Sequence, residues 1–167
     1  VDIFAIDGKW KLLSKLENVG PKERFQAARY IGNRLYLVTF EQVDPLFVID
    51  TTDSKNMKVM GELTMPGYST YLHPYDDNHL IGIWFDTKTS SWGGTMNGGL
   101  KIDLYDVTDI TKPKQQYSKI FGGIGSSSDV IYNPRALVWD DARKTLLMPV
   151  QLLDQNQVTY QYTSAWQ

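Results

Sequence analysis

Residues 47–59 read FVIDTTDSKNMKV, and residues 104–115, LYDVTDITKPKQ, repeat the same plan. In both, a short apolar stretch ends in an aspartate, a turn rich in Asp and Thr follows, and a second strand-like segment comes next. The stretch FAID is a third copy, and successive copies are 43 and 56 residues apart, measured between Asp7, Asp50 and Asp106. Because repeats of about 40 to 50 residues are typical of β-propeller blades, this spacing predicts a repeating β architecture.

A strand, a tight turn and another strand precede the phrase in the later repeats. Residues 30–38, YIGNRLYLV, carry Gly32 and Asn33 between two apolar runs, which is typical of a two-residue hairpin. Residues 77–83 repeat the second half of this pattern, and residues 138–148 give a further copy. Each complete repeat therefore predicts four short strands, and the chain is predicted to be all-β.

One segment leaves two interpretations open. KWKLLSKLENVG, residues 9–20, places Trp10, Leu13 and Leu16 at roughly helical spacing. Its position directly after FAID instead predicts the outer strand of a blade, as in the other repeats. We favour the strand.

The repeats predict four-stranded antiparallel blades of a β-propeller, with about three blades' worth of strand in this chain. We expect a half blade at residues 1–20, complete blades at about 25–67 and 68–123, and a partial blade at about 124–167. A closed ring needs at least about four blades. The chain is therefore expected to be a fragment of a larger propeller, or to associate with a second copy so that the incomplete blades complete each other.

The composition narrows the classes of partner. The 167 residues carry 17 Lys and Arg against 19 Asp and Glu, and the charges are dispersed, so nucleic acid is not an expected partner. No apolar run approaches the roughly 18 residues that span a bilayer, and we expect no membrane span in this segment. The absence of cysteine excludes disulfides, thiolate zinc sites and a cysteine nucleophile. The chain begins at Val1 rather than methionine, and we expect it to be a piece of a longer protein.

The repeated aspartates could hold either an ion or a turn. Asp50, Thr52 and Asp53 present oxygen atoms at neighbouring positions, and such oxygens bind Ca²⁺ in proteins. A calcium loop recruits about six to eight oxygens, usually with a glycine at the bend, and neither phrase supplies them. We therefore expect these side chains to accept hydrogen bonds from backbone N–H groups and to fix the turn. No metal site is predicted.

Two other stretches invite a metal or catalytic interpretation. His73 and His79 flank two aspartates in YLHPYDDNHL, but a cross-strand histidine pair lacks a third ligand, so we favour a surface hairpin. GGIGSSS, residues 122–128, lacks the lysine and the following helix of a phosphate loop and contains no Gly-x-Ser-x-Gly pattern. We expect a flexible connection between blades there, and we predict no catalytic residue and no cofactor.

The stretch DTKTSSWGGTMNGG, residues 86–99, predicts an extended loop that accounts for the longer second interval. Trp92 in this loop is either exposed, to stack on a sugar or pack on a protein, or folded back over Trp84 and Phe85 to cover its own blade. We keep Trp84, Phe85 and Trp92 as the candidate contacts, so that a protein or carbohydrate partner is expected at this loop.

Nearly the whole chain resembles the β-propeller domain of prokaryotic secreted proteins, a family distantly related to WD40 repeats. The likeness rests on RYIGNRLYLVTFEQVDPLFVID and the residues that follow it, on GGLKIDLYDVTDITKPK, and on SSSDVIYNPRALVWDDARKTLLMPV. It implies a propeller and an extracytoplasmic location, either secreted or at the cell envelope. It implies no reaction and no catalytic residues. Trp84 and Phe85 depart from the Gly and polar residue that are more usual in the family.

These observations favour a binding or scaffolding role over an enzyme. Propellers present recognition loops on a rigid core, so the expected function is a non-catalytic binding module of an exported or cell-envelope protein. The alternative is an extracytoplasmic hydrolase or lyase with an acidic site at the propeller channel, completed by blades outside this chain. An enzyme predicts clustered titratable groups with shifted pKa values, whereas a binding module predicts exposed aromatic residues near Trp92.

Overall fold

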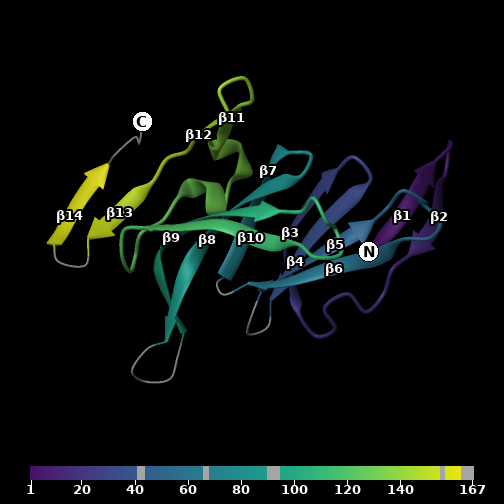
Figure 1. The fold of residues 1–167 in the computed structure, drawn as a ribbon, viewed down its shortest axis with the longest axis horizontal. Coiled ribbons are helices and arrows are strands. Elements are labelled where there is room, and N and C mark those ends of the chain that lie inside the picture. The colour runs from purple at the N-terminus through teal and green to yellow at the C-terminus, as the bar shows by residue number, and fades with distance from the viewer. Residues whose placement is uncertain (41–43, 66–67, 90–94, 155–156, 163–167) are drawn as a thin grey trace.

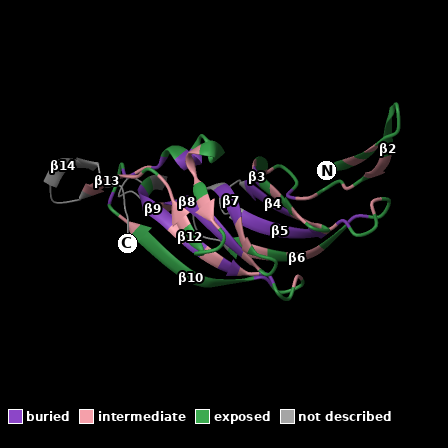
Figure 2. Ribbon diagram, turned by 90° about the horizontal axis from the view of Figure 1, so that it is seen from above, coloured by how far each residue is buried: buried purple, intermediate pink, exposed green. Residues whose placement is uncertain are grey.

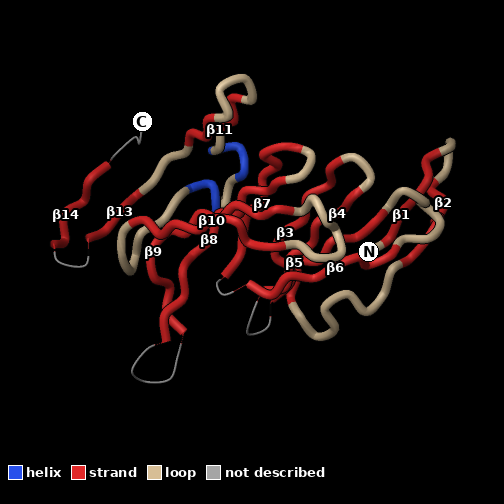
Figure 3. Tube along the Cα trace, viewed as in Figure 1, coloured by secondary structure: helices blue, strands red, loops and turns tan. Residues whose placement is uncertain are grey.

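The computed structural model describes residues 1–40, 44–65, 68–89, 95–154 and 157–162. It is an elongated molecule in which successive sheets stand side by side from the N-terminus to the C-terminus (Figure 1). The regular structure of the described residues is β-strand, apart from two single-turn 3-10 helices in the C-terminal third (Figure 3). The predicted all-β class is therefore confirmed.

Two four-stranded antiparallel sheets form the centre of the molecule, and in each the strands are hydrogen-bonded in chain order. The first sheet contains β3 (Arg24–Ile31), β4 (Arg34–Phe40), β5 (Asp44–Asp50) and β6 (Lys58–Met65). The second sheet contains β7 (Tyr68–Asp76), β8 (His79–Thr89), β9 (Thr95–Asp106) and β10 (Lys114–Phe121). Four antiparallel strands in chain order are what the repeats predicted for a propeller blade.

The repeated Asp-containing phrase forms the turn after the third strand of each central sheet. Oδ1 of Asp50 accepts hydrogen bonds from the backbone N–H and the hydroxyl of Thr52, at 2.9 and 2.6 Å. Oδ1 of Asp106 accepts in the same way from the backbone N–H of Thr108, at 2.9 Å. Because these bonds fix the backbone where the strand ends, the prediction that the aspartates hold turns is confirmed.

A second hydrogen bond recurs where the third strand meets the turn between the first two. The backbone N–H of Thr51 donates to the carbonyl of Asn33 at 2.9 Å, and that of Val107 donates to the carbonyl of Asn78 at 2.8 Å. Each bond joins the residue after the repeated aspartate to the hairpin of the same sheet. The sequence repeat therefore corresponds to the same backbone hydrogen bond in both central sheets.

The N-terminal segment is a two-stranded antiparallel sheet of β1 (Asp2–Ile6) and β2 (Trp10–Lys15). The strand interpretation of KWKLLSKLENVG is thus confirmed over Trp10–Lys15. The chain reverses between the strands at Gly8, whose φ of 67° lies in the left-handed region that glycine adopts without strain.

The C-terminal third forms two short antiparallel pairs of strands. The pairs are β11 (Val138–Asp140) with β12 (Thr145–Leu147), and β13 (Gln151–Asp154) with β14 (Gln157–Tyr162). Ser127 bridges Gln151, and Val138 pairs with Leu147, so residues 128–137 stand opposite only residues 148–150. The excess residues form the 3-10 helices η1 (Asp129–Ile131) and η2 (Pro134–Ala136), which interrupt the first strand of this unit.

The prediction of an extended loop at residues 86–99 is wrong for most of that stretch. Residues up to Thr89 continue β8, and residues from Thr95 begin β9, with Thr87 paired to Asn97 and Lys88 to Met96. The threonine-rich sequence suits a strand, and Gly98 leaves room for the Asp86 side chain, which a Cβ there would meet at 2.8 Å. The long second repeat thus contains a long hairpin, which extends from the body of the molecule in Figure 1.

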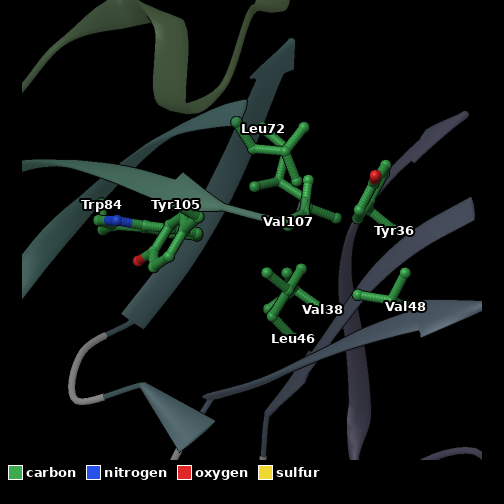
Figure 4. Close-up of a cluster of buried hydrophobic side chains, with 10 residues drawn as sticks. Tyr36, Val38, Leu46, Val48, Leu72, Trp84, Tyr105 and Val107 are labelled. Atoms are coloured by element: carbon green, nitrogen blue, oxygen red, sulfur yellow. The ribbon is translucent and has the colours of Figure 1, made fainter. Parts of the chain in front are cut away.

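Apolar side chains fill the spaces between neighbouring sheets rather than a single central core. The cluster between the first and second sheets is fully buried and appears in Figure 4. Separate clusters lie between the N-terminal hairpin and the first sheet, and between the second sheet and the C-terminal unit. The inner strands β4, β5 and β8 are therefore buried at consecutive positions, on both faces, and they contrast with the exposed outer strand β10 in Figure 2.

Candidate functional site

The first strands of the two central sheets, β3 and β7, bring the sheets together. Each is the edge strand of its sheet. Of all the strand pairs that join the two central sheets, β3 and β7 make the most extensive contact. Since the sheets converge at β3 and β7, these strands face the axis around which a propeller closes. A ligand site on this side is therefore built from the first strands of successive repeats.

Four side chains from three repeats meet along this side, and we name them the inner-strand cluster: Arg29 of β3, Tyr71 and His73 of β7, and Trp139 of β11. The guanidinium carbon of Arg29 lies 5.8 Å from the centre of the Tyr71 ring. The His73 ring lies 6.2 Å from that of Tyr71 and 5.2 Å from that of Trp139. The cluster therefore combines one cation, one hydroxyl and three aromatic rings.

Hydrogen bonds link Arg29, Tyr71 and His73 in a chain, and each bond has a defined donor and acceptor. Nη2 of Arg29 lies 3.4 Å from the hydroxyl of Tyr71, and that hydroxyl lies 3.3 Å from Nδ1 of His73. Arginine can only donate, so the Tyr71 oxygen accepts from Arg29 and its own O–H is left to donate to Nδ1. Neutral His73 then carries its proton on Nε2.

The surroundings of His73 favour this neutral form. Burial lowers the pKa of His73 below its ordinary value, and the positive charge of Arg29 lowers it further. The residue is only 9% exposed, so a charged imidazole there loses most of its hydration. At neutral pH Arg29 is thus the permanent cation of the cluster.

Two nitrogen atoms of the cluster are buried without a hydrogen-bond partner in the described structure: Nε of Arg29 and Nε2 of His73. Both carry hydrogen under the assignment above, so both are donors. Buried donors without acceptors are uncommon in folded proteins because each loses its hydrogen bonds to water. The cluster therefore has donors to spare and lacks acceptors.

Aromatic side chains continue from the cluster along β7. The Tyr75 ring packs on Trp139 at 5.5 Å and on His79 at 6.3 Å, both edge-on. The Lys144 ammonium lies 5.7 Å from the centre of the Tyr75 ring, and its Nζ pairs with Asp141 at 2.7 Å. This end of the cluster is therefore held by local contacts and balanced in charge.

The interrupted first strand of the C-terminal unit adds an exposed projection beside the cluster. Val130 and Ile131 of η1 are buried against the second sheet, while Tyr132 directly after them is 81% exposed. The hydroxyl of Ser128 accepts from the N–H of Val130 and donates to the carbonyl of Pro149 at 2.6 Å, which anchors the segment. A fixed base with an exposed tyrosine suits contact with a partner.

The predicted contact residues lie elsewhere. Trp84 and Phe85 are 2% and 6% exposed and belong to the clusters on opposite faces of the second sheet. The Trp84 ring lies over Gly82, where a Cβ would come within 1.8 Å of it, so the small residue at 82 makes room for the indole. Trp92 lies outside the described residues. Contact of the three residues with a ligand stays a prediction.

The two histidines do not form a pair. His73 is covered by Trp139, whereas Nδ1 of His79 pairs with the Asp76 carboxylate at 2.8 Å across the turn. The predicted hairpin is confirmed by the antiparallel pairing of β7 and β8, but His73 is not at the surface because Trp139 of the C-terminal unit covers it. Within the described ranges, no three His, Asp or Glu side chains lie close enough together to hold a metal ion.

The serine-rich connection is more ordered than a flexible linker. The Ser126 hydroxyl accepts a hydrogen bond from the N–H of Leu153 at 2.9 Å, and Ser126 and Ser128 are 1% and 3% exposed. The side chains of these serines bond to the backbone of Leu153 and Pro149, where the first strand of the C-terminal unit no longer pairs with its neighbour through its own backbone. A 3-10 turn also begins at Asp129, although no helix was expected after the serines.

Sequence reasoning missed the inner-strand cluster. Tyr71, His73 and Tyr75 alternate along β7, which places their side chains on one face of the strand. That alternation was visible in YLHPYDDNHL, but it indicated only a hairpin because Arg29 and Trp139 join the face from other repeats.

Self-association stays a prediction. The N-terminal hairpin exposes the apolar side chains of Phe4, Ile6, Trp10 and Leu12, and a groove of about 630 Å³ lies between its second strand and the first sheet. These features support pairing with a further strand, and the mass of the protein in solution tests it.

Comparison with known proteins places the chain in a family. The model of the β-propeller domain family matches residues 1–167. An uncharacterized protein of Archaeoglobus fulgidus is 33% identical over 148 residues, and an uncharacterized protein of Methanocaldococcus jannaschii is 36% identical over 148 residues. Each alignment covers 89% of this chain and 22% of the archaeal protein, so the chain spans about a fifth of the length of these relatives.

The chain belongs to the β-propeller domain family. Its two four-stranded central sheets are consistent with blades of that fold, and the assignment of the end hairpins to further blades stays a prediction. No helix among the described residues is long and apolar enough to cross a membrane.

Proposed function

We propose that the chain is part of a non-catalytic binding module that contacts its partner through the first-strand side of the propeller. The observation that carries this proposal is the inner-strand cluster, in which Arg29, Tyr71, His73 and Trp139 come from three successive repeats. A purely structural role for this side calls for apolar packing, as in the cluster between the two central sheets. Apolar packing is present here too, since Tyr71 joins the cluster between the second sheet and the C-terminal unit, but this side also carries a cation and spare hydrogen-bond donors.

The partner expected from this surface is a protein or a carbohydrate. Exposed Tyr132, which directly follows η1, supplies an aromatic ring, and the inner-strand cluster supplies polar groups that give orientation. Aromatic residues with a polar end are enriched where proteins bind partners because they combine contact area with hydrogen bonding. The loop that contains Trp92 is a second candidate contact.

Binding to panels of immobilised oligosaccharides and peptides tests the proposal. We expect saturable binding of at least one probe without chemical change to it, and a loss of at least tenfold in affinity for Trp139→Ala or Tyr132→Ala. Trp10→Ala is the matched control, because Trp10 is 73% exposed on the N-terminal hairpin at the other end of the molecule. A chain that binds nothing, or loses binding only with Trp10→Ala, contradicts the proposal.

The same panels separate binding from catalysis. A hydrolase or lyase with an acidic site at the channel converts its probe, so cleaved oligosaccharides detected by mass spectrometry favour the enzyme. Because that site needs further blades, the measurement is made on the full-length protein. Stable complexes without products favour the binding module.

We further propose that the module acts outside the cytoplasm, secreted or at the cell envelope. The support is the resemblance of RYIGNRLYLVTFEQVDPLFVID and its neighbouring segments to propeller domains of secreted proteins. Protease accessibility of the full-length protein on intact cells tests this location. Protection on intact cells together with digestion after lysis contradicts it.

A further inference from the structure

The charge of the inner-strand cluster has no counter-ion in the described structure. Arg29 forms no ion pair with any described carboxylate, whereas Lys101, Lys114 and Lys144 each have one. A guanidinium that is half-buried and unpaired is costly, because burial removes part of its hydration. The hydroxyl of Tyr71, to which Arg29 donates within the described part of the chain, is neutral.

The spare hydrogen-bonding groups of the cluster are of one kind. Arg29 Nε–H and His73 Nε2–H are buried donors without acceptors, and the Tyr71 hydroxyl is already used by its two neighbours. An ammonium group adds donors and leaves this imbalance in place, and a hydroxyl accepts but brings a further donor of its own. An oxygen that only accepts is the complementary group, and a carboxylate also supplies the missing negative charge.

The position of the cluster suits a ligand better than an internal partner. β7 is an edge strand, so its far side has no further strand of its own sheet. Arg29 reaches this edge from β3, and Trp139 reaches it from the C-terminal unit. Side chains from all three repeats therefore meet at one place.

We propose that the inner-strand cluster binds a carboxylate group of the ligand, with Arg29 as the charge partner and His73 as a neutral hydrogen-bond donor. The inference rests on the proposed binding function and specifies the chemistry of its site. Tyr71 is a positioning residue, because it holds Arg29 and His73 in one hydrogen-bonded chain. The lowered pKa of His73 agrees with this division of roles, since it leaves His73 uncharged at neutral pH.

Nuclear magnetic resonance of the isotopically labelled protein tests the inference with acetate as the probe. We expect acetate to shift the Arg29 Nε and His73 Nε2 resonances saturably at pH 7. Acetamide has nearly the same shape without the charge, and we expect it to bind at least tenfold more weakly. Equal shifts with both probes, or none with acetate, overturn the proposal.

Two variants assign the effect to Arg29. Arg29→Gln is expected to abolish the acetate-dependent shift of His73, whereas Arg24→Gln, the same change at an exposed position of the same strand, is expected to retain it. If Arg29→Gln does not fold, Tyr71→Phe keeps the ring and removes the hydroxyl. In that variant the Arg29 resonance still responds to acetate, while the His73 response falls at least threefold. An unchanged His73 response in either variant contradicts the site.

Larger probes identify the source of the carboxylate. Glucuronate compared with glucose represents an acidic sugar, and N-acetylglutamate compared with N-acetylglutamine represents an acidic peptide. The carboxylate inference predicts that the charged member of at least one pair binds more tightly. Panel binding that needs Trp139 but survives Arg29→Gln overturns the carboxylate site and leaves the proposed binding function intact.

Discussion

The two faces of β7 show how one strand serves both stability and recognition. Leu72 points to the first sheet and joins a cluster of buried residues that is almost wholly apolar. Tyr71 and His73, its neighbours in sequence, point to the C-terminal unit and meet polar and aromatic groups. Because side chains alternate along a strand, a single substitution on β7 affects one face and spares the other.

The difference follows from what covers each face. A complete blade lies against the Leu72 face, and its regular strands pair with one another along the sheet. The other face is covered by a unit whose first strand is interrupted at residues 128–137. Where the backbone is irregular, side chains make the contacts instead: Ser128 donates to the carbonyl of Pro149, and Trp139 packs on His73. The cluster therefore forms where the repeat is least regular.

The largest expected effect comes from breaking the apolar face. Leu80 of β8 is fully buried between the two central sheets, so Leu80→Ala removes buried methyl groups and leaves a cavity. We expect a loss of about 2 to 5 kcal/mol in the free energy of unfolding, measured with urea. Leu12→Ala is the control, because Leu12 is 48% exposed and its loss is expected to be within about 0.5 kcal/mol.

The fit of Trp84 over Gly82 gives the next effect. Gly82→Ala places a Cβ within 1.8 Å of the indole, and Trp84 cannot move freely because the Tyr105 ring packs against it at 5.7 Å. We expect a loss of about 1 to 3 kcal/mol in unfolding free energy. Adding Trp84→Phe relieves the clash, so the double variant loses less than the sum of the two single losses. Strict additivity contradicts this account of Gly82.

How far the sequence predicts the molecule depends on the range of the interactions. The recurrence of Asp7, Asp50 and Asp106 predicted the repeat because turn chemistry is local, and Asp50 and Asp106 each accept hydrogen bonds from residues beside them. The hairpin at Gly32 and Asn33 was visible for the same reason. Four-stranded sheets follow once each repeat contains these local signals.

The candidate site was beyond such reasoning. Arg29 and Trp139 stand far apart in the sequence, and nothing local to either indicates that both reach β7. Glycine and serine content suggested a loop at residues 86–99, but cross-strand pairing extended β8 and β9 into most of it. Contacts between repeats thus decided both what the sequence analysis missed and what it misread.

A smaller effect tests whether the repeated turns are independent of ions. Asp50→Ala removes the acceptor for the Thr52 N–H and hydroxyl, and we expect a loss of about 0.5 to 2 kcal/mol in unfolding free energy by analogy with lost helix caps. Asp77→Ala is the control, because the Asp77 side chain makes no hydrogen bond within the described part of the chain. Calcium is expected to leave the melting temperature of the parent unchanged. A calcium-dependent rise that Asp50→Ala abolishes contradicts the turn assignment.

The smallest expected effect concerns the polar face of β7 and its response to pH. The pKa of His73 is lowered in the folded state, first by burial and then by Arg29, so the unfolded chain binds this proton at higher pH than the folded one. Stability is therefore complete above about pH 6.5, the ordinary histidine value, and declines as the pH falls toward the lower folded pKa. His73→Phe keeps an aromatic ring and removes the titration, so urea unfolding of this variant is expected to depend less on pH in that window. The control is His79→Gln, which retains His73 as the one histidine and is expected to keep the decline in stability at low pH. If the stability of His73→Phe depends on pH as much as that of the parent, the decline does not come from the polar face of β7.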